Sequence, residues 1–393
     1  MQHNYKIRKN DIFFFIAYAL YLIAQILSTS FFYKYIMGDV FNVSLTVCIL
    51  LLILQECIRN KIDGKSLFIL ALGVGLVILS YTAMPGILQN RIFHLILFIY
   101  VGRKVDFDKI AKVSCIITFF LLFIIVTCSK IGIIENYTYI FSDDRISRTR
   151  QYLGFRYTLF GPALLFNATA IYIYIKNKSI KWRDVLLCAA LNIYMYMQTY
   201  SRLSFYFSII LIVIAIATKW ELHILSRNNI CTVAFRRVAV FSYVLAAIIS
   251  YYFVAFYNPG ITWMKDLNLI LENRLFFGQL SILKYGVSLT GQNIKWVGNG
   301  LDAFGERYVG SYLYVDNFYL QILQNYGLLF AFLIILFFTY ALYKCLKKKQ
   351  YYLFCIFVLI ALHGIIDDLI LSLHYNTFWL AILPLLFNKE KIN

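Results

Sequence analysis

The chain has 393 residues, of which 61% are hydrophobic and only 14% are charged. That hydrophobic share is too high for a soluble domain of this length, in which about half of the residues are apolar. The net charge of +18 is spread over many loops instead of one face, so we expect no nucleic-acid partner. The eight cysteines form no CxxC motif or Cys/His cluster, which argues against a disulfide framework and a zinc site.

Apolar runs long enough to cross a bilayer recur along the whole chain. Lipid offers an open backbone no hydrogen-bond partner, so each span must be a helix. We therefore predict an all-α polytopic membrane protein with about twelve spans of about 20 residues each. The predicted spans lie near residues 12–32, 40–58, 66–84, 86–101, 111–134, 157–175, 184–200, 203–220, 238–257, 318–343, 351–366 and 374–388. The first of them lacks a small-residue cleavage site and is interpreted as a retained span, not a signal peptide.

The basic residues predict the orientation of these spans. Cytoplasmic loops carry an excess of Lys and Arg. Most of the 37 Lys and Arg residues fall in segments 1–11, 59–65, 102–112, 176–183, 219–237, 344–350 and 389–393. If these segments are cytoplasmic, both termini are cytoplasmic as well, and the topology is N-in/C-in.

Two long segments, 135–156 and 258–317, then lie on the outer side. Within the second, "LNLILENRLFFGQLSILKYG" has apolar residues at helical spacing and predicts an amphipathic helix over 267–286 that lies against the membrane surface. The stretch "VGNGLDAFG" predicts a Gly-rich turn. We expect residues 1–393 to form a single membrane domain with an outer cap.

Arginines are concentrated in the first outer segment, where the orientation rule predicts few. They are Arg145, Arg148, Arg150 and Arg156. Because the planar guanidinium clamps phosphate oxygens and keeps its charge, we interpret this segment as a binding site for a phosphate or pyrophosphate. The alternatives are attraction to anionic lipid headgroups and pairing with the two preceding aspartates.

Four further residues outside this segment can carry charge: Arg202, Arg274, Arg91 and His94. Arg202 in "TYSRLSF" lies at the outer end of a helix hairpin, where it marks a functional site or extends to the headgroups. Arg274 lies on the amphipathic helix and either binds an anion or faces solvent. Arg91 and His94 share a helix face, and either line a polar cavity or mark the end of a span.

The stretch "VDNFYLQILQN" places an acid and several amides at the outer start of a span. A cap explains Asp316 or Asn317, but not Gln321, Gln324 and Asn325, which continue a polar stripe into the membrane. This stripe suits a hydroxyl-rich ligand near the bilayer surface.

Asp316 could also accept a proton from an attacking hydroxyl, if burial adjusts its pKa. The rival bases are Glu272, Asp302 and Glu306. The adjacent Asp367 and Asp368 are interpreted as a cap and not a metal site, because neighbours on a helix point about 100° apart.

Three stretches give the chain a resemblance to the Wzy-type polysaccharide polymerases of the O-antigen polymerase and ligase superfamily. "RQYLGFRYTLFGP" is similar to the family's Arg and Leu-Gly-Phe pattern, and "TYSRLSFYFSIIL" is similar to its Ser-Arg hairpin. "VGNGLDAFG" followed by "VDNFYLQILQNYGLLFAF" resembles its turn and Asn-x-Tyr-Leu entry into a span. Two departures stand out: Phe160 and Gly161 occupy positions where an Asn is expected, and Asp316 stands where many relatives have His.

The resemblance implies a GT-C-like membrane glycosyltransferase of the bacterial cytoplasmic membrane, which uses no nucleotide sugar, metal or other cofactor. It implies transfer of a growing capsule, exopolysaccharide or O-antigen glycan from polyprenyl pyrophosphate to the free end of another lipid-linked repeat. It suggests a chain-length regulator and a flippase as partners. A glycan ligase, a flippase or transporter of lipid-linked sugars, and a non-enzymatic scaffold remain the alternatives.

We assign roles to the site residues on this basis. The predicted catalytic residues are Arg202, Asp316 and Arg274. The predicted ligands of the pyrophosphate and glycan are Arg148, Arg150, Arg156, Asn317, Tyr319, Gln321 and Asn325.

Overall fold

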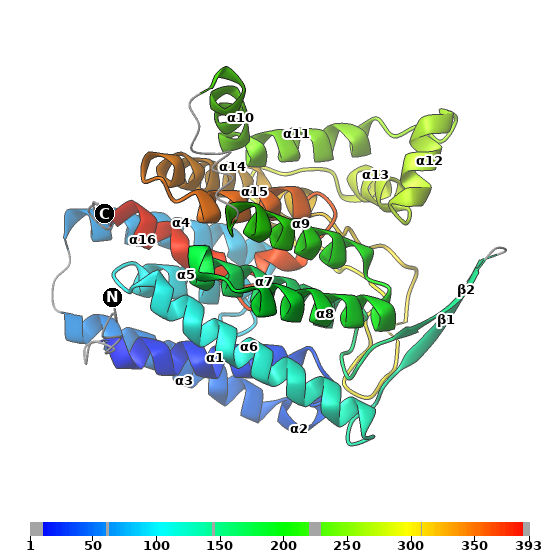
Figure 1. Ribbon diagram of the computed structural model, residues 1–393, viewed down its shortest axis with the longest axis horizontal. Coiled ribbons are helices and arrows are strands. Elements are labelled where there is room, and N and C mark those ends of the chain that lie inside the picture. The colour runs from blue at the N-terminus through cyan, green and yellow to red at the C-terminus, as the bar shows by residue number, and fades with distance from the viewer. Residues whose placement is uncertain (1–10, 60–62, 144–145, 220–228, 308, 388–393) are drawn as a thin grey trace.

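Apolar helices, most of them running roughly parallel, make up the body of the protein (Figure 1). The computed structural model describes residues 11–59, 63–143, 146–219, 229–307 and 309–387. The first half contains α1 (Ile12–Ser28), α2 (Tyr33–Ile36), α3 (Asp39–Arg59), α4 (Gly64–Ala83), α5 (Arg91–Gly102), α6 (Phe107–Lys130), β1 (Thr138–Asp143), β2 (Ile146–Gln151), α7 (Phe160–Lys176), η2 (Asn177–Ser179) and α8 (Trp182–Thr199). The second half contains α9 (Arg202–Lys219), α10 (Ile230–Val240), α11 (Ser242–Ala255), α12 (Thr262–Ile270), α13 (Arg274–Tyr285), α14 (Phe318–Lys347), α15 (Tyr351–His363), η4 (Leu369–Leu371), η5 (Thr377–Ala381) and α16 (Ile382–Phe387).

Several of these helices are suited to a membrane. Among the described residues, α3, α4, α6 and α14 are long and apolar enough to cross one, and α10 with α11 forms a further apolar segment bent by 62°. Each predicted span overlaps a helix, but some, such as α1 and α15, are shorter than a typical crossing. The fold is therefore that of a mainly helical membrane protein, and the larger number of spans stays a prediction.

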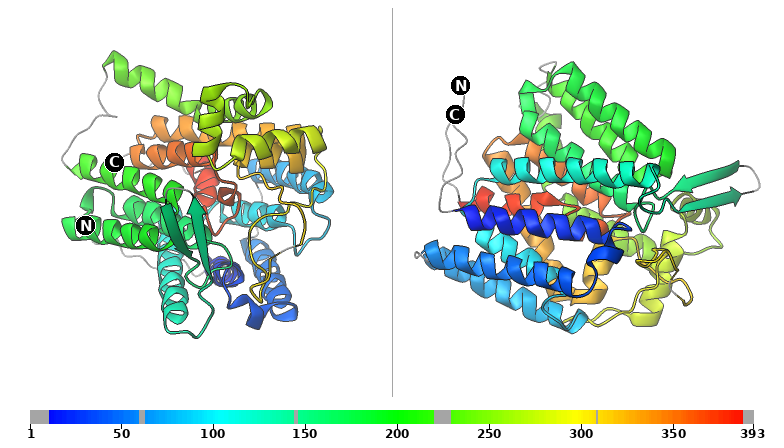
Figure 2. Two further views of the ribbon diagram at one scale, coloured as in Figure 1. Left: turned by 90° about the vertical axis from the view of Figure 1, so that its right-hand side faces the viewer. Right: turned by 90° about the horizontal axis from the view of Figure 1, so that it is seen from below.

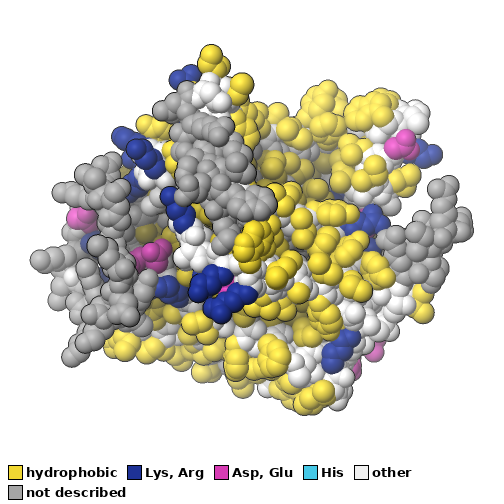
Figure 3. Space-filling view, in the orientation of Figure 1, with side chains coloured by type: hydrophobic (Ala, Val, Ile, Leu, Met, Phe, Trp, Pro, Cys, Tyr) yellow, Lys and Arg dark blue, Asp and Glu magenta, His cyan; other side chains and the backbone are white. Residues whose placement is uncertain are grey.

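Large apolar side chains cover much of the surface (Figure 3). On α4, Phe68 is 70% exposed, and on α6, Ile116 is 70% exposed. Contiguous apolar surface of this extent is unfavourable in water, and its position on long helices matches contact with lipid tails.

A β-hairpin replaces part of the predicted outer loop. Strands β1 and β2 pair antiparallel, with Thr138 opposite Gln151, and the hairpin projects to the right in Figure 1 and in the right-hand view of Figure 2. Aromatic and β-branched residues in "TYIF" favour strands. The all-α expectation is corrected at this one element.

The predicted amphipathic helix over 267–286 is two helices, α12 and α13. Glu272 and Asn273 have left-handed backbones, with φ of 52° and 65°, and end the first helix. The Asn268 side chain holds the turn, because it donates to Asn273 Oδ1 and accepts from the N–H of Phe276. This turn sets the position of Arg274, the first residue of α13.

Helix α14 is broken at Gly327, whose φ is 88° and ψ 170°. The segment around Gly291 lies against this break, and backbone N–H groups of Leu328 and Leu329 bond to the carbonyls of Ser288 and Leu289. A Cβ on Gly291 would lie 2.3 Å from the carbonyl oxygen of Asn325, so both glycines are required by the close approach of two backbones.

The last predicted span, 374–388, is also interrupted. It begins with the short η5 and continues as α16. Asn376 caps η5 through Phe378 N–H, and Thr377 bonds to Asn167 and Ser114 of neighbouring helices. These polar contacts fix the irregular segment between α15 and η5, which carries two acids of the site described below.

Candidate functional site

The site lies where α11, α13, the start of α14 and the segment after α15 meet. Asn317 is the N-cap of α14: its Oδ1 accepts from the N–H of Leu320 at 3.0 Å, and its Nδ2 donates to the Ile365 carbonyl at 2.6 Å. The cap prediction therefore holds for Asn317. Asp316 does not cap α14, and its carboxylate has a different partner.

Asp316 pairs with Arg274. Arg274 Nε lies 3.5 Å from Asp316 Oδ2, and both side chains are mostly buried. Burial raises the pKa of the Asp316 carboxyl above its ordinary value, and the charge of Arg274 opposes that shift. The charge of Asp316 also adds to the effect of burial in raising the pKa of Tyr312. Two of the three predicted catalytic residues are thus in contact.

This pair borders a cavity of about 180 Å³. Its walls are mainly apolar, from α11, α12, α13 and the start of α14, and include Phe253, Leu271 and Leu320. A dry cavity of about 150 Å³ is known to hold benzene. The space therefore fits part of an apolar chain with a charged group at the Arg274 end.

A second arginine joins the same neighbourhood. Arg150 of β2 lies 3.2 Å from Glu272, in the turn directly before Arg274. The ion pair connects the base of the hairpin to the α12–α13 turn. Two of the predicted anion-binding residues, Arg150 and Arg274, are therefore held close together by separate acids.

Arg156 has a different environment. Its guanidinium donates to the carbonyls of Ser28 and Leu301 and lies 4.8 Å from the ring centroid of Tyr33. Its own carbonyl accepts from the N–H of Leu301. These contacts give Arg156 a structural role, since it connects the end of α1 to the segment at Leu301.

The remaining predicted arginines are not part of this described cluster. Arg202 is exposed at the start of α9, after Tyr200 ends α8 with a left-handed backbone. The predicted helix hairpin is thus present. Arg148 lies in β2 opposite Phe141, and its side chain is outside the described part, as is all of Arg145.

The polar stripe on α14 is buried and is hydrogen-bonded to α13 and to the segment between α13 and α14. Asn325 donates to Gln321 and accepts from the indole of Trp296. Gln324 accepts from Ser281. These contacts stabilise the packing of α13 and the segment that follows it against α14.

Gln321 and Tyr319 also donate to backbone carbonyls, those of Val315 and Ala361. Among the described residues, all the stripe's side chains therefore have protein partners. Their predicted contact with a glycan stays a prediction.

Two buried acids were not recognised as site residues from the sequence. Asp367 accepts from the N–H of Leu369, as a cap does, and lies 3.4 Å from His363. Asp368 instead accepts from the hydroxyl of Tyr314 at 2.8 Å. Both interact electrostatically with Asp316. Their position as adjacent acids within an apolar stretch was the feature of the sequence that could have identified them as site residues.

Arg91 is the third charged group that sequence reasoning left open. It is the first residue of α5, and its Nε donates to the hydroxyl of Tyr326 at 3.2 Å. It interacts electrostatically with Asp368. His94 instead bonds to the carbonyl of Asn90 and stacks against Tyr21. Arg91 thus both begins a helix and belongs to the polar cluster.

The rival bases are less suited than Asp316. Asp302 accepts from the N–H groups of Glu306 and Phe304, and these bonds lower the pKa of its carboxyl. Glu272 pairs with Arg150, and Glu306 is exposed. Burial makes Asp316 the stronger base.

Across the described ranges, no group of three or more His, Cys, Asp and Glu side chains is arranged to hold a metal ion. No protein-family model, curated protein or solved structure was found to match the chain. The chemistry that the residues support is stabilisation of an anion by Arg274 and Arg150, and proton acceptance by Asp316.

Proposed function

We propose that this chain is a Wzy-type polymerase of lipid-linked oligosaccharide repeats in the bacterial cytoplasmic membrane. The observation that carries the proposal is the Arg274–Asp316 pair at the edge of an apolar cavity. A lipid pyrophosphate needs a cation for its head and an apolar space for its tail, and this site offers both. The three sequence stretches that resemble the family contribute Arg150, Arg202 and Asp316.

The proposed topology has about twelve spans with both termini in the cytoplasm, following the basic segments. The hairpin, α12 and α13 lie at the end of the bundle away from α16 (Figure 1). In this topology they face the outer side of the membrane, where flipped lipid-linked repeats are found.

In the proposed reaction, the bond between the anomeric carbon of the growing glycan and the carrier's pyrophosphate breaks. A new bond forms from that carbon to a hydroxyl oxygen of the acceptor repeat. Arg274 and Arg150 neutralise the charge that develops on the leaving pyrophosphate. The hydroxyl proton passes to the carboxylate of Asp316.

The ion pair couples these two steps. When the pyrophosphate binds Arg274, it competes with Asp316 for the guanidinium. Asp316 then loses part of its counter-charge while it stays buried, which raises its pKa further. Donor binding therefore makes Asp316 a stronger base at the moment when the acceptor needs one.

The deciding experiment is deletion of the gene in its host, followed by measurement of glycan length on the carrier lipid and at the cell surface. A collapse to single repeats that are still exported supports a polymerase. Repeats trapped inside the cell point to a flippase. Full-length polymer that stays on its carrier points to a ligase. Complementation with the wild-type chain is the control.

A further inference from the structure

The candidate site contains more buried acids than arginines. Asp316, Asp367 and Asp368 interact electrostatically with one another, and the arginines that act on them are Arg274 and Arg91. Asp367 and Asp368 are 6% and 2% exposed. If all three carboxyls were ionised, one buried negative charge would have no cation to balance it. Because such a charge is costly, one of the three acids keeps a proton.

Two of the three acids have contacts that stabilise their charged form. Asp316 pairs with Arg274 at 3.5 Å. Asp368 accepts from the hydroxyl of Tyr314 at 2.8 Å, and the charge of Arg91 also acts on it. A hydrogen bond to a carboxylate and a nearby cation both favour ionisation. These two acids are therefore the ones that lose their protons.

Asp367, which lies between two predicted spans, has no such cation in contact. Its carboxyl accepts from the N–H of Leu369 at 2.8 Å, and the side chain beside it is His363. Burial, followed by the charge of Asp368, raises the pKa of the Asp367 carboxyl further than burial raises that of Asp368. The proton of the cluster therefore resides on Asp367.

His363 of α15 provides a partner for this proton. Its Nε2 lies 3.4 Å from Asp367 Oδ2, and its side chain is 1% exposed. Neither ring nitrogen has a hydrogen-bond partner among the described residues. The ring is held in place by Phe166 and Phe207, whose ring centroids lie 4.8 Å and 5.2 Å away. A buried imidazole normally has a partner, and a protonated Asp367 supplies a donor to it.

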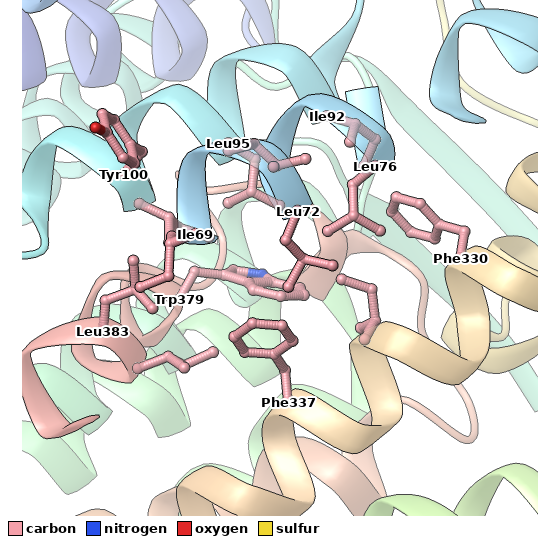
Figure 4. Close-up of a pocket in the computed structure, with 15 residues that line it drawn as sticks. Ile69, Leu72, Leu76, Ile92, Leu95, Tyr100, Phe330, Phe337, Trp379 and Leu383 are labelled. Carbon is pink, nitrogen blue, oxygen red and sulfur yellow. The ribbon is translucent and has the colours of Figure 1, made fainter. Parts of the chain in front are cut away.

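An apolar region closes the acid-bearing segment on the side of α4 and α5. The segment leads into η5, where the indole of Trp379 donates to the carbonyl of Ile370 at 2.9 Å. Trp379 packs with Leu72 of α4 and Phe337 of α14 around an apolar space of about 60 Å³ (Figure 4). Apolar walls offer a water molecule no hydrogen bonds. The acids therefore exchange protons on the other side, toward the cavity of the candidate site.

That cavity brings both kinds of acid close to the same arginine. Ile365 and Ile366 line the cavity and directly precede Asp367 in the chain. Arg274 borders the cavity and interacts electrostatically with both Asp316 and Asp367. An anion bound to Arg274 is thus close to one ionised acid and one protonated acid. Two acids whose environments differ in this way are suited to act as base and acid in one reaction.

We propose that Asp367 is a catalytic acid, which donates its proton to an oxygen of the leaving polyprenyl pyrophosphate, and that His363 is a positioning residue for it. This inference rests on the proposed function. The bond from the anomeric carbon to the pyrophosphate oxygen breaks, and its electron pair and the proton of Asp367 go to that oxygen. The proton of the acceptor hydroxyl goes to Asp316. Its transfer from Asp316 to Asp367 then restores both acids.

Other titratable groups surround the acids. Most are tyrosines, which stay neutral below a pH of about 10. Glu272 pairs with Arg150. His374 interacts electrostatically with Arg91 and has an ordinary pKa near neutral pH, so it needs a control of its own. The tyrosines that interact with the acids are Tyr157, Tyr312, Tyr314 and Tyr375.

The test is the pH dependence of polymerisation by the purified full-length chain in lipid nanodiscs. The substrate is the lipid-linked repeat isolated from the deletion host. Infrared spectra of the same samples report protonated carboxyls, which absorb apart from ionised carboxylates. Asp367→Asn removes the acid with little change of shape. The matched control is Asp368→Asn, the same substitution at the neighbouring residue, and His374→Gln controls for the histidine.

We expect the wild-type rate to rise and then fall with pH, because Asp316 must be ionised and Asp367 must be protonated. Asp367→Asn should lower the maximal rate by about 100-fold to 10,000-fold. It should also lose the fall at high pH and a band of a protonated carboxyl. Asp368→Asn and His374→Gln should keep both the fall and the band.

Two results separate this inference from the proposed function. If folded Asp367→Asn polymerises with the same fall at high pH and keeps the full band, Asp367 is not the acid, and the proposed function stands. If the wild-type chain polymerises at no pH, the proposed function and the catalytic role of Asp367 both fail. The infrared band then decides separately whether Asp367 holds a proton.

His363→Gln keeps the test decisive if Asp367→Asn does not fold. Loss of the imidazole should move the midpoint of the fall at high pH and the frequency of the carboxyl band, neither of which a purely structural role would change. An unchanged midpoint and band in folded His363→Gln would show that Asp367 and His363 share no proton, and would overturn the pair.

Discussion

Arg274 Nε and Asp316 Oδ2 lie 3.5 Å apart, although the whole Gly-rich turn region separates the two residues in the chain. Arg274 begins α13, directly after the left-handed turn at Asn273, and Asp316 directly precedes Asn317, the N-cap of α14. Placing a cation and an acid beside an apolar cavity removes both charges from water, and this desolvation costs free energy. Binding of a ligand therefore explains the pair better than a contribution to stability does.

Arg274→Gln should abolish chain growth. Loss of one donor to a developing charge costs about 2.7–4 kcal/mol, or about 100-fold to 1,000-fold in rate. Glycan length and membrane expression are measured together in the deletion host. The control is Lys284→Gln, an exposed residue of the same helix. Wild-type chain lengths in folded Arg274→Gln would remove Arg274 from the mechanism.

Activity should rise with pH through the raised pKa of Asp316, because the carboxyl must lose its proton before it can accept another. Stability should change in the opposite direction. A folded pKa above the unfolded value means that the native state holds the proton more tightly, so this contribution is lost as pH rises through the folded pKa. Asp316→Asn should lose both the activity and this part of the pH dependence of thermal unfolding. An unchanged pH profile in Asp316→Asn would assign the base elsewhere.

Arg202→Ala separates function from stability, since the side chain is exposed. We expect chain growth to stop while the protein inserts and is expressed normally. Arg183→Ala is the matched control: it removes an exposed arginine from the start of α8, at the other end of the same hairpin. Full-length polymer from Arg202→Ala would show that Arg202 is not catalytic.

The sequence predicts the helices well because lipid allows little else for long apolar runs. It does not predict where those helices break. Gly327 in a predicted span has no local feature that distinguishes it, and its conformation depends on the distant segment at Gly291. The break before Arg274 depends on the side chain of Asn268.

The candidate site also combines features that are local in the sequence with features that depend on distant segments. Arginine in a predicted outer segment is a local signal, and it singled out Arg150 and Arg274, which the fold brings close together through ion pairs with Glu272 and Asp316. Arg156 stands in the same predicted segment as Arg150 and was selected for the same reason. Its guanidinium instead donates to backbone carbonyls. Asp368 was interpreted as part of a cap, and Arg91 was left open between a polar cavity and the end of a span. Their interaction joins residues far apart in the chain, so only the tertiary structure reveals it.

Arg156→Ala should lower the thermal stability of the protein and leave the rate of polymerisation by the folded protein unchanged. A hydrogen bond to a charged group contributes about 1.5–3 kcal/mol, and two carbonyl contacts and the stacking on Tyr33 are lost together. Thermal unfolding in detergent should occur at a lower temperature. Arg156→Lys should restore little, because an ammonium cannot reproduce the planar fork. A stable Arg156→Ala chain that fails to polymerise would instead support the predicted contact with pyrophosphate.

Gly327→Ala should destabilise the protein at the break in α14. Its backbone conformation is nearly restricted to glycine, and a Cβ there would lie 2.3 Å from the N atom of Gly291 and 2.5 Å from the carbonyl oxygen of Leu289. We expect a loss of at least about 1–3 kcal/mol from backbone strain alone, measured as a lower midpoint of thermal unfolding. Gly75→Ala is the control, because this helical glycine of α4 has open space around its Cβ position and should tolerate alanine or gain stability. If both variants unfolded at the wild-type temperature, α14 would have to be continuous and the segment around Gly291 would have to lie elsewhere.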